Sequence, residues 1–342
     1  MIGGLEAFAA MLAGGLYERG HEVVVLCQSE KEADKAEPFP FRVVRRPSLP
    51  QMARWMSWSE VVVHAQISLK GLLPWLVTRR PLLVSHQTWL RETGGAPLTW
   101  QTRLKRRMCR LAVNVTCSAA VGQDLELPHE VIPNPYNHVL FKARSDVLRE
   151  WDLLFVGRLV SDKGADLLLE AVAQLADNGV RLTTTITGSG PEEDALKSQV
   201  SALGLTEQVR FTGPLSGEAL ARMMNAHRVL VVPSRWEEPF GIVALEGLAS
   251  GCNVVVSDGG GVGEAVGACG LLFKRNSAIA LRDALLMSRQ INLSPEVRER
   301  HLAQHSITSV TERFEKVIQR THSHQFLIDH NDKKNVAMKK TL

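Results

Sequence analysis

The sequence of 342 residues lacks the cysteine pattern of a disulfide framework or of a zinc site. Its five cysteines are scattered, odd in number and never spaced as C-x-x-C, which is typical of a protein from a reducing compartment. No apolar run approaches the ~18–20 residues that a membrane-spanning helix needs. The N-terminus also lacks the charged and then apolar layout of a signal peptide. We therefore expect a soluble, cytoplasmic protein.

The sequence also lacks a strong excess of charge of either sign. Its formal net charge is +4, with 22% charged and 45% hydrophobic residues. A nucleic-acid-binding protein would carry more basic residues, concentrated in patches, so we expect no nucleic acid among the partners. The length and the apolar content together suffice for two hydrophobic cores.

Helix and strand patterns alternate along the first 133 residues. Apolar residues recur at helical spacing from Leu5 to Leu16, and an apolar run at 23–27 then predicts a buried strand. Further strands are expected at 41–44, 61–64, 82–85 and 113–117. Apolar strands separated by helices indicate βαβ units and a parallel sheet covered on both faces.

Two prolines, Pro133 and Pro135, interrupt this alternation and predict a linker near Asn134. A second series follows, with strands at 153–156, 183–187, 209–211, 229–232 and 253–256. The fold class is therefore α/β, with two doubly wound, Rossmann-like domains at 1–133 and 134–306. Ligands are expected at the carboxyl ends of the strands, in a cleft between the domains. A helix at 307–320 and a polar, disordered tail at 321–342 are expected after them.

The first predicted domain begins at a glycine-rich turn, Gly3-Gly4, without the strand that normally precedes such a turn. In the usual strand order, 3-2-1-4-5, that first strand lies inside the sheet. Its absence would leave two strand edges unpaired. We expect from this that the sequence is truncated or starts at a misplaced Met.

Two carboxylates, Glu238 and Glu246, have seven residues between them and surround a predicted helix start. Glu238 follows the strand at 229–232, and Glu246 lies about one turn into the next helix. Backbone amides from Phe240 to Val243 lie at the helix N-terminus, where free N–H groups and the helix dipole favour an anion. These carboxylates can accept hydrogen bonds from sugar or ribose hydroxyls. Alternatively, they are solvated glutamates of an ordinary first turn.

Two cations, Arg158 and Lys163, lie five apart in the loop after the strand at 153–156. Arg offers a planar bidentate fork and Lys a compact charge, and together they suit a diphosphate. In that role they would replace a metal ion at the leaving group, so no Asp-x-Asp motif is required. We therefore expect neither a metal nor a cofactor. The alternative is two surface cations on a solvated loop.

Glycines follow several predicted strands, at Gly188, Gly213 and 259–263. Glycine allows the backbone to approach a ligand closely. None of these segments is a G-x-G-x-x-G fingerprint with an acid about 20 residues further on, which argues against a dehydrogenase.

The stretch 100–111 is predicted to be a basic helix next to an aromatic residue, Trp100. Its basic residues are Arg103, Lys105, Arg106, Arg107 and Arg110. Such a helix can rest on an anionic membrane surface, which would place the protein peripherally at the inner face of the membrane. The alternative is a solvated basic face.

In this order, the elements resemble the second domain of the family-four (group 1) retaining glycosyltransferases, which have the GT-B architecture. The resemblance extends from about Phe155 to Phe273. It includes Val156-Gly157-Arg158-Leu159, Gly188-Ser189-Gly190-Pro191 and Glu238-Pro239-Phe240-Gly241 with Glu246. The first domain agrees more loosely, through Gly3-Gly4-Leu5-Glu6, Arg19-Gly20-His21-Glu22-Val23 and the linker Ile132-Pro133-Asn134.

The resemblance implies site roles. Arg158 and Lys163 would hold the diphosphate and neutralise the leaving group, and Glu246 would bind the ribose hydroxyls. Glu238 would hold hydroxyls of the transferred sugar, and His86, at the end of a predicted strand, would contact the same sugar. The remaining donor-binding residues expected from the resemblance are Gly3, Gly4, Gly188, Gly213, Leu215, Phe240, Gly241 and Ile242, with the Gly213–Leu215 turn facing the base.

The resemblance further implies transfer of a sugar from a nucleotide-diphosphate sugar to a hydroxyl of a glycan or lipid-linked acceptor. Transfer would occur with retention and without a metal, in the synthesis of a cell-surface polysaccharide or glycolipid. Front-face attack, with the donor phosphate helping to deprotonate the acceptor, needs no protein nucleophile. Two alternatives stay open: another GT-B enzyme, such as a sugar-nucleotide epimerase or a phosphorylase, and a non-catalytic nucleotide-sugar-binding protein.

Overall fold

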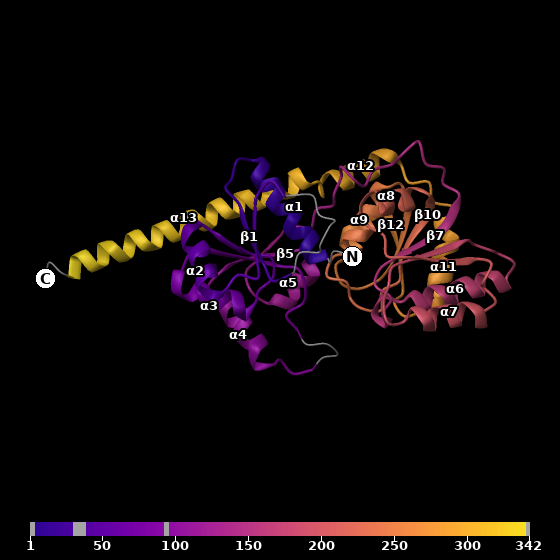
Figure 1. Cartoon of the computed structure of the whole chain (residues 1–342), viewed down its shortest axis with the longest axis horizontal. Coiled ribbons are helices and arrows are strands. Elements are labelled where there is room, and N and C mark those ends of the chain that lie inside the picture. The colour runs from indigo at the N-terminus through magenta and orange to yellow at the C-terminus, as the bar shows by residue number, and fades with distance from the viewer. Residues whose placement is uncertain (1–3, 30–38, 92–95, 340–342) are drawn as a thin grey trace. The chain divides into compact units, whose positions relative to one another are not determined.

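The structure, a computed structural model, describes the backbone of residues 4–29, 39–91 and 96–339, and side chains up to residue 323 (Figure 1). The described chain divides into two compact units. One, the N-terminal unit, contains Gly4–Pro133 and the segment from Ile307 onward. The other, the C-terminal unit, is Asn134–Ser306.

The strands of the N-terminal unit are all parallel but belong to two sheets. They are β1 (Val24–Cys27), β2 (Arg42–Arg45), β3 (Val62–His64), β4 (Leu82–His86), β5 (Val113–Thr116) and β6 (Glu130–Val131). β1 pairs with β2, and the other four form a sheet in the order β3-β4-β5-β6. No strand among the described residues pairs with both sheets. The missing first strand stays a prediction.

Polar caps start most helices of this unit. Its helices are α1 (Gly4–Glu18), α2 (Leu49–Trp58), α3 (Leu69–Thr78), α4 (Trp100–Cys109), α5 (Ala119–Leu125) and α13 (Ile307–Lys339). Side chains of Ser48, Ser68, Thr99 and Ser118 accept the amide hydrogen three residues further on, at the starts of α2 to α5. Such caps satisfy amides that would otherwise have no partner in the helix.

One apolar core joins α2, α3, α4 and α5 to the sheet of β3 to β6. Met52 and Met56 from α2, Trp75 from α3 and Cys109 from α4 are buried together in it. These helices therefore cover the same face of that sheet. In the same unit α1 packs against α13, with the Phe8 and Phe314 rings 5.7 Å apart.

The C-terminal helix is longer than expected. The sequence predicts a helix at 307–320 and a disordered tail, whereas α13 continues to Lys339. Residues 321–339 contain neither Gly nor Pro, so nothing in the backbone chemistry ends the helix at residue 320. None of the helices in the described part of the chain is both long and apolar enough to cross a membrane.

The C-terminal unit is built on one parallel sheet whose order places its first strand in the middle. The strands are β7 (Trp151–Val156), β8 (Thr184–Thr187), β9 (Val209–Gly213), β10 (His227–Val232), β11 (Asn253–Ser257) and β12 (Gly270–Phe273). Their order is β12-β11-β10-β7-β8-β9. The chain moves outward from β7 to β9 and then returns to the other side of β7. The direction reverses between β7 and β10, and ligands of such sheets bind at the carboxyl ends of the strands at this switch point.

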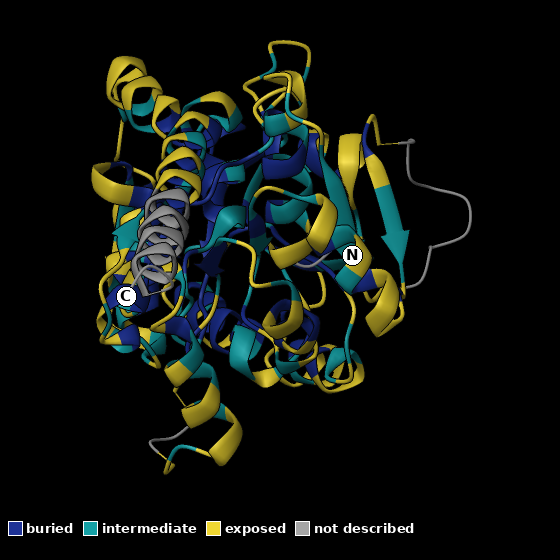
Figure 2. Ribbon diagram, turned by 90° about the vertical axis from the view of Figure 1, so that its left-hand side faces the viewer, coloured by how far each residue is buried: buried dark blue, intermediate teal, exposed yellow. Residues whose placement is uncertain are grey.

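Helices cover both faces of this sheet (Figure 1). α6 (Ala165–Asp177), α7 (Glu193–Ala202) and α11 (Ala278–Ser288) lie on one face. α8 (Gly217–Asn225), α9 (Ile242–Ala249), α10 (Val262–Val266) and α12 (Pro295–Ala303) lie on the other, and short 3-10 turns occur at η2 (Ser161–Lys163) and η3 (Gly267–Cys269). Because both faces are covered, the central segments of β7 and β10 are mostly apolar and buried. Figure 2 shows buried residues in dark blue beneath an outer layer that is mostly teal and yellow.

Candidate active site

Two loops meet at the switch point of the C-terminal sheet. The loop after β7 ends in η2 and carries Lys163, and the loop after β10 carries Ser234 and Glu238. Lys163 Nζ donates a hydrogen bond to Glu238 Oε1 at 2.6 Å, and Ser234 Oγ donates to the same oxygen at 2.6 Å. The Lys163 and Glu238 side chains are only 23% and 14% exposed. An ion pair shielded to this degree is screened less by solvent than one on the open surface.

Backbone contacts hold the same two loops together. The carbonyl oxygen of Asp162 accepts hydrogen bonds from the amides of Arg235 at 2.8 Å and Trp236 at 3.1 Å. Arg235 also pairs through Nη2 with Asp166 Oδ2 at 2.5 Å, at the start of α6. The position of Lys163 relative to Glu238 is therefore fixed by the loops and not by the ion pair alone.

Arg158 lies on the β7 loop with its side chain exposed. Within the described residues, no hydrogen bond or ion pair engages its guanidinium group. Arg158 therefore keeps its fork of N–H donors available for a planar or tetrahedral anion.

Helix α9 begins directly after Glu238 and points its N-terminus at this site. Its N-cap, Gly241, has φ 100°, a conformation that favours glycine, and a Cβ there would lie 2.9 Å from Val262 Cγ2. The amides of Ile242 and Val243 are the first of the helix and have no acceptor within it. Phe240, in contrast, is 3% exposed and packs in the core, so only its backbone is available to a ligand.

Glu246 lies one turn into α9 and is partly buried. Burial raises the pKa of its carboxyl to about 8, although the nearby helix N-terminus favours the charged form. At neutral pH the group is therefore mostly protonated, and it can both donate and accept a hydrogen bond. This suits it to recognise hydroxyl groups rather than a cation.

The glycines of the site bring loop backbones close together. Gly188 has φ 147°, and a Cβ there would lie 1.8 Å from the carbonyl oxygen of Gly157 in the β7 loop. The Gly188 amide donates to the carbonyl of Gly213 at 3.0 Å, at the end of β9. The loops after β7, β8 and β9 therefore pack backbone to backbone, with Leu215 partly buried just beyond Gly213.

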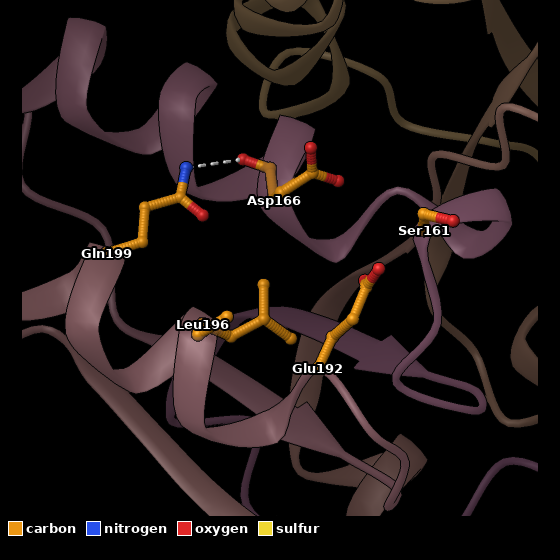
Figure 3. A pocket seen from close by; sticks show the side chains of 6 residues that line it. Ser161, Asp166, Glu192, Leu196 and Gln199 are labelled. Atoms are coloured by element: carbon orange, nitrogen blue, oxygen red, sulfur yellow. Dashed lines mark hydrogen bonds between the residues drawn. The ribbon is translucent and has the colours of Figure 1, made fainter.

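A pocket of about 230 Å³ opens beside the site, between η2, α6 and α7 (Figure 3). Its lining includes Ser161, Asp166, Glu192, Leu196 and Gln199, and Gln199 Nε2 donates to the Asp166 carbonyl at 3.2 Å. The sequence analysis named none of these residues. Four of them are isolated polar positions on helices and turns and Leu196 is a buried leucine, and only the fold brings them together. Ser234 was likewise missed as a partner of Glu238, because a lone serine after a strand gives no distinct signal.

His86, expected to contact the transferred sugar, belongs to the N-terminal unit. Its side chain is 0% exposed in β4, and its Nε2 lies 2.9 Å from Asn114 Oδ1 of β5. Asn114 in turn donates to the carbonyl of Cys109 at 2.9 Å. Burial lowers the pKa of the His86 imidazole, so the ring is neutral and carries its proton on Nε2. In the N-terminal unit β4 is thus buried along its length, and the sugar contact expected of His86 stays a prediction.

Two other expected site residues lie at the start of the chain. Gly3 lies outside the described residues, and Gly4 is the exposed first residue of α1. Across the described ranges, no group of three or more His, Cys, Asp and Glu side chains is arranged to hold a metal ion.

Comparison with known proteins identifies the family of the chain. The family model for group 1 glycosyl transferases matches residues 140–298, and that for glycosyltransferase family 4 matches residues 2–139. The chain is 40% identical over 313 residues to the uncharacterized glycosyltransferase MJ1607 of Methanocaldococcus jannaschii, covering 78% of this chain and 79% of the relative. It is 37% identical over 319 residues to the glycogen synthase of Mycobacterium tuberculosis, covering 78% and 77%.

Solved structures share the fold at low sequence identity. The crystal structure of Anabaena HepE in complex with UDP and glucose superposes with a TM-score of 0.76 at 18% identity, covering 93% of this chain and 96% of that one. This likeness, together with the two Rossmann-like units of parallel strands, shows that the chain has the GT-B fold. The chain belongs to the group 1, or family 4, glycosyltransferases.

Proposed function

We propose that this glycosyltransferase transfers a sugar from a nucleotide-diphosphate sugar to a hydroxyl acceptor, with retention of configuration and without a metal ion. The observation that carries the proposal is the Lys163–Glu238 pair at the switch point, with Arg158 exposed on the same loop. These groups supply positive charge and a carboxylate within one small site.

The diphosphate of the donor binds Arg158 and Lys163 in this proposal. Both cations lie on the β7 loop, and the first amides of α9 add hydrogen-bond donors from the opposite side of the switch point. Negative charge grows on the leaving diphosphate as the bond to the sugar breaks. Fixed cations and amides stabilise that charge without needing to reorganise.

The sugar and the ribose are held by the two glutamates. Lys163 and Ser234 both contact Glu238 Oε1, and no described residue is bonded to its Oε2, which can accept from a sugar hydroxyl. Glu246, with its raised pKa, donates to one ribose hydroxyl oxygen and accepts from a neighbouring hydroxyl.

The reaction breaks the bond between sugar C1 and the β-phosphate oxygen, and a bond from the acceptor oxygen to C1 forms on the same face. The acceptor proton passes to the departing phosphate oxygen. No side chain of the enzyme has to form a covalent bond with the sugar. The acceptor is a glycan or lipid-linked hydroxyl, and the product belongs to a cell-surface polysaccharide or a glycolipid.

Donor screening tests this proposal. Binding and slow hydrolysis are measured for a panel of UDP- and GDP-sugars, starting with UDP-glucose because the similar HepE structure contains UDP and glucose. We expect one donor to bind and to be hydrolysed equally well with and without EDTA. NMR of the glycoside product should show the anomeric configuration of the donor. Inverted product, or complete loss of activity in EDTA, would overturn the proposed mechanism.

The same experiment separates the alternatives. A sugar-nucleotide epimerase converts the donor without an acceptor, and a phosphorylase requires inorganic phosphate. A protein that only binds nucleotide sugars would give calorimetric binding without any turnover or hydrolysis.

A further inference from the structure

The outer side of α3 and α4 in the N-terminal unit combines exposed apolar side chains with unpaired cations. We propose that this surface, called here the α3–α4 face, binds the surface of an anionic lipid bilayer. The proposal does not depend on the donor site, because it concerns the other unit of the chain.

The sequence around this face is strongly basic. Between residues 49 and 111 there are ten Lys and Arg residues against two Glu and no Asp. The chain as a whole has a net charge of only +4, so the positive charge is concentrated in this region. A local excess of this kind attracts anionic headgroups through a distance of about one Debye length.

The exposed side of α4 carries apolar and cationic residues in adjacent stripes. Trp100 and Leu104 are 69% and 39% exposed, and Leu111, 64% exposed, continues the same spacing just beyond the helix. Positions four and eleven residues apart lie on one side of a helix. Arg103 and Arg107 are exposed along the edge of this stripe.

The cations of α4 divide into two sets. Arg106 is turned toward α5, where it donates to the Asp124 carbonyl at 2.9 Å and pairs with Glu126 at 3.3 Å. It fixes the orientation of α4. For Arg103, Arg107 and Arg110 no ion pair exists with any described residue, so their charge is available to an external partner.

Helix α3 extends the apolar part of the face. Leu73, Leu76 and Val77 are 56%, 47% and 81% exposed, at the three- and four-residue spacing of one helix side. Arg79 and Arg80 follow at the C-terminal end. α3 and α4 cover the same face of the sheet, so the outer side of each helix faces away from that sheet (Figure 1).

The chemistry of the face favours a bilayer over a merely solvated basic surface. A solvated face would have polar residues between its arginines, whereas this one has a tryptophan and leucines. Exposed apolar side chains of this size gain from burial at the boundary of headgroups and acyl chains, and tryptophan prefers that boundary. α4 is yellow along its outer side in Figure 2, as such a contact requires.

Vesicle flotation tests the proposal with the full chain. Vesicles of phosphatidylcholine alone are compared with vesicles of phosphatidylcholine mixed with phosphatidylglycerol, at low and high salt. We expect the protein to float with the anionic vesicles only and to dissociate partly at high salt. Equal binding to both vesicles, or binding to neither, would overturn the proposal.

Two variants locate the contact. The first combines Arg103→Glu, Arg107→Glu and Arg110→Glu, and we expect vesicle binding to fall at least ~tenfold, because each cation near the surface contributes about fivefold. The second combines Trp100→Ser with Leu104→Ser, which should weaken binding at high salt as well as at low salt.

A matched control keeps net charge from explaining the result. Arg181→Glu, Arg289→Glu and Arg300→Glu change three exposed arginines of the C-terminal unit and alter net charge by the same amount. We expect this variant to float almost like the unchanged protein. If both triple variants lost binding equally, the α3–α4 face would not be the contact. Circular dichroism checks that each variant is folded. The flotation assay measures no sugar transfer, so its result is independent of whether the proposed function is correct.

Discussion

Lys163 and Glu238 lie on different loops of the C-terminal sheet, and their side chains meet at 2.6 Å across its switch point. Each side chain therefore determines the surroundings of the other before any ligand binds. The lysine orients the carboxylate, and the carboxylate holds the ammonium group next to the β7 loop. Preorganisation of this kind lowers the cost of stabilising charge in a transition state.

Replacement of the lysine tests this relationship. Lys163→Ala should lower kcat by about 10²–10³-fold, because a fixed cation at the leaving group is lost. Binding of the free nucleoside, which has no phosphate, should change little. Steady-state kinetics and calorimetry measure the two effects separately. Lys197→Ala is the matched control, since Lys197 pairs with Glu193 on the surface of α7. Equal losses in kcat and in nucleoside binding would contradict the role at the leaving group.

Removal of the α9 carboxyl group should affect donor binding. Glu246→Ala should weaken binding of the nucleotide sugar about tenfold, because one or two hydrogen bonds to hydroxyls are lost. Calorimetry with the ribonucleotide and its 2′-deoxy form locates the effect. The variant should no longer distinguish the two, whereas Glu170→Ala, an exposed change on α6, should distinguish them as before. Continued discrimination by Glu246→Ala would remove the ribose assignment.

Glu246 should also make the free energy of unfolding depend on pH. Its pKa is raised from the ordinary 4.5 to about 8 in the folded state. The stability that the protonated carboxyl provides is therefore fully present below pH 4.5 and is lost as pH rises through about 8. Glu246→Gln cannot ionise, so its free energy of unfolding relative to the unchanged protein should rise across this interval and then level off. Urea unfolding at a series of pH values measures the difference, and a flat difference would argue against the raised pKa.

The sequence indicates where these candidate site residues lie in the fold, because they follow strands within short, motif-like segments. Arg158, Lys163 and the Glu238–Glu246 element all lie in loops at the switch point of one sheet, where the alternation of strands and helices places them. The strand order alone is enough to bring these loops to the same end of the sheet. The ion pair between Lys163 and Glu238 could not be predicted, because it depends on side-chain directions across 75 residues of chain.

His86 shows what a sequence pattern leaves open, and α13 shows a helix end that the pattern misplaced. A histidine at a strand end looks the same in sequence whether it faces solvent or is covered by another layer, and here it is covered. Polarity of the last residues suggested disorder, but polarity alone does not end a helix without Gly or Pro.

A variant of His86 should separate stability from catalysis. His86→Ala should lower the free energy of unfolding by roughly 2–4 kcal/mol, because it opens a cavity and leaves Asn114 Oδ1 without its partner. At a temperature where the variant is fully folded, its kcat and its KM for the donor should stay close to those of the unchanged protein. His129→Ala, a change at a less buried histidine of the same unit, controls for loss of imidazole. A large fall in kcat with unchanged stability would instead support a direct contact of His86 with the sugar.

Two glycines with positive φ offer the sharpest test of loop packing. Gly188 has φ 147°, and a Cβ there would lie 1.8 Å from the Gly157 carbonyl oxygen, whereas Gly204 has φ 67° with nothing within 4 Å. Gly204→Ala should cost only the conformational strain, about 1–2 kcal/mol. Gly188→Ala must also push the β7 and β8 loops apart. Gly188→Ala should therefore lower the free energy of unfolding more than Gly204→Ala does. It should also displace Arg158, which lies next to Gly157. Urea unfolding measures the loss of stability, and calorimetry measures the affinity for the donor. Gly204→Ala should keep full donor affinity. Gly188→Ala should lower donor affinity at least ~tenfold, which is the effect of losing one charged hydrogen bond. Equal affinities in the two variants would show that the close approach of these loops does not position the donor site.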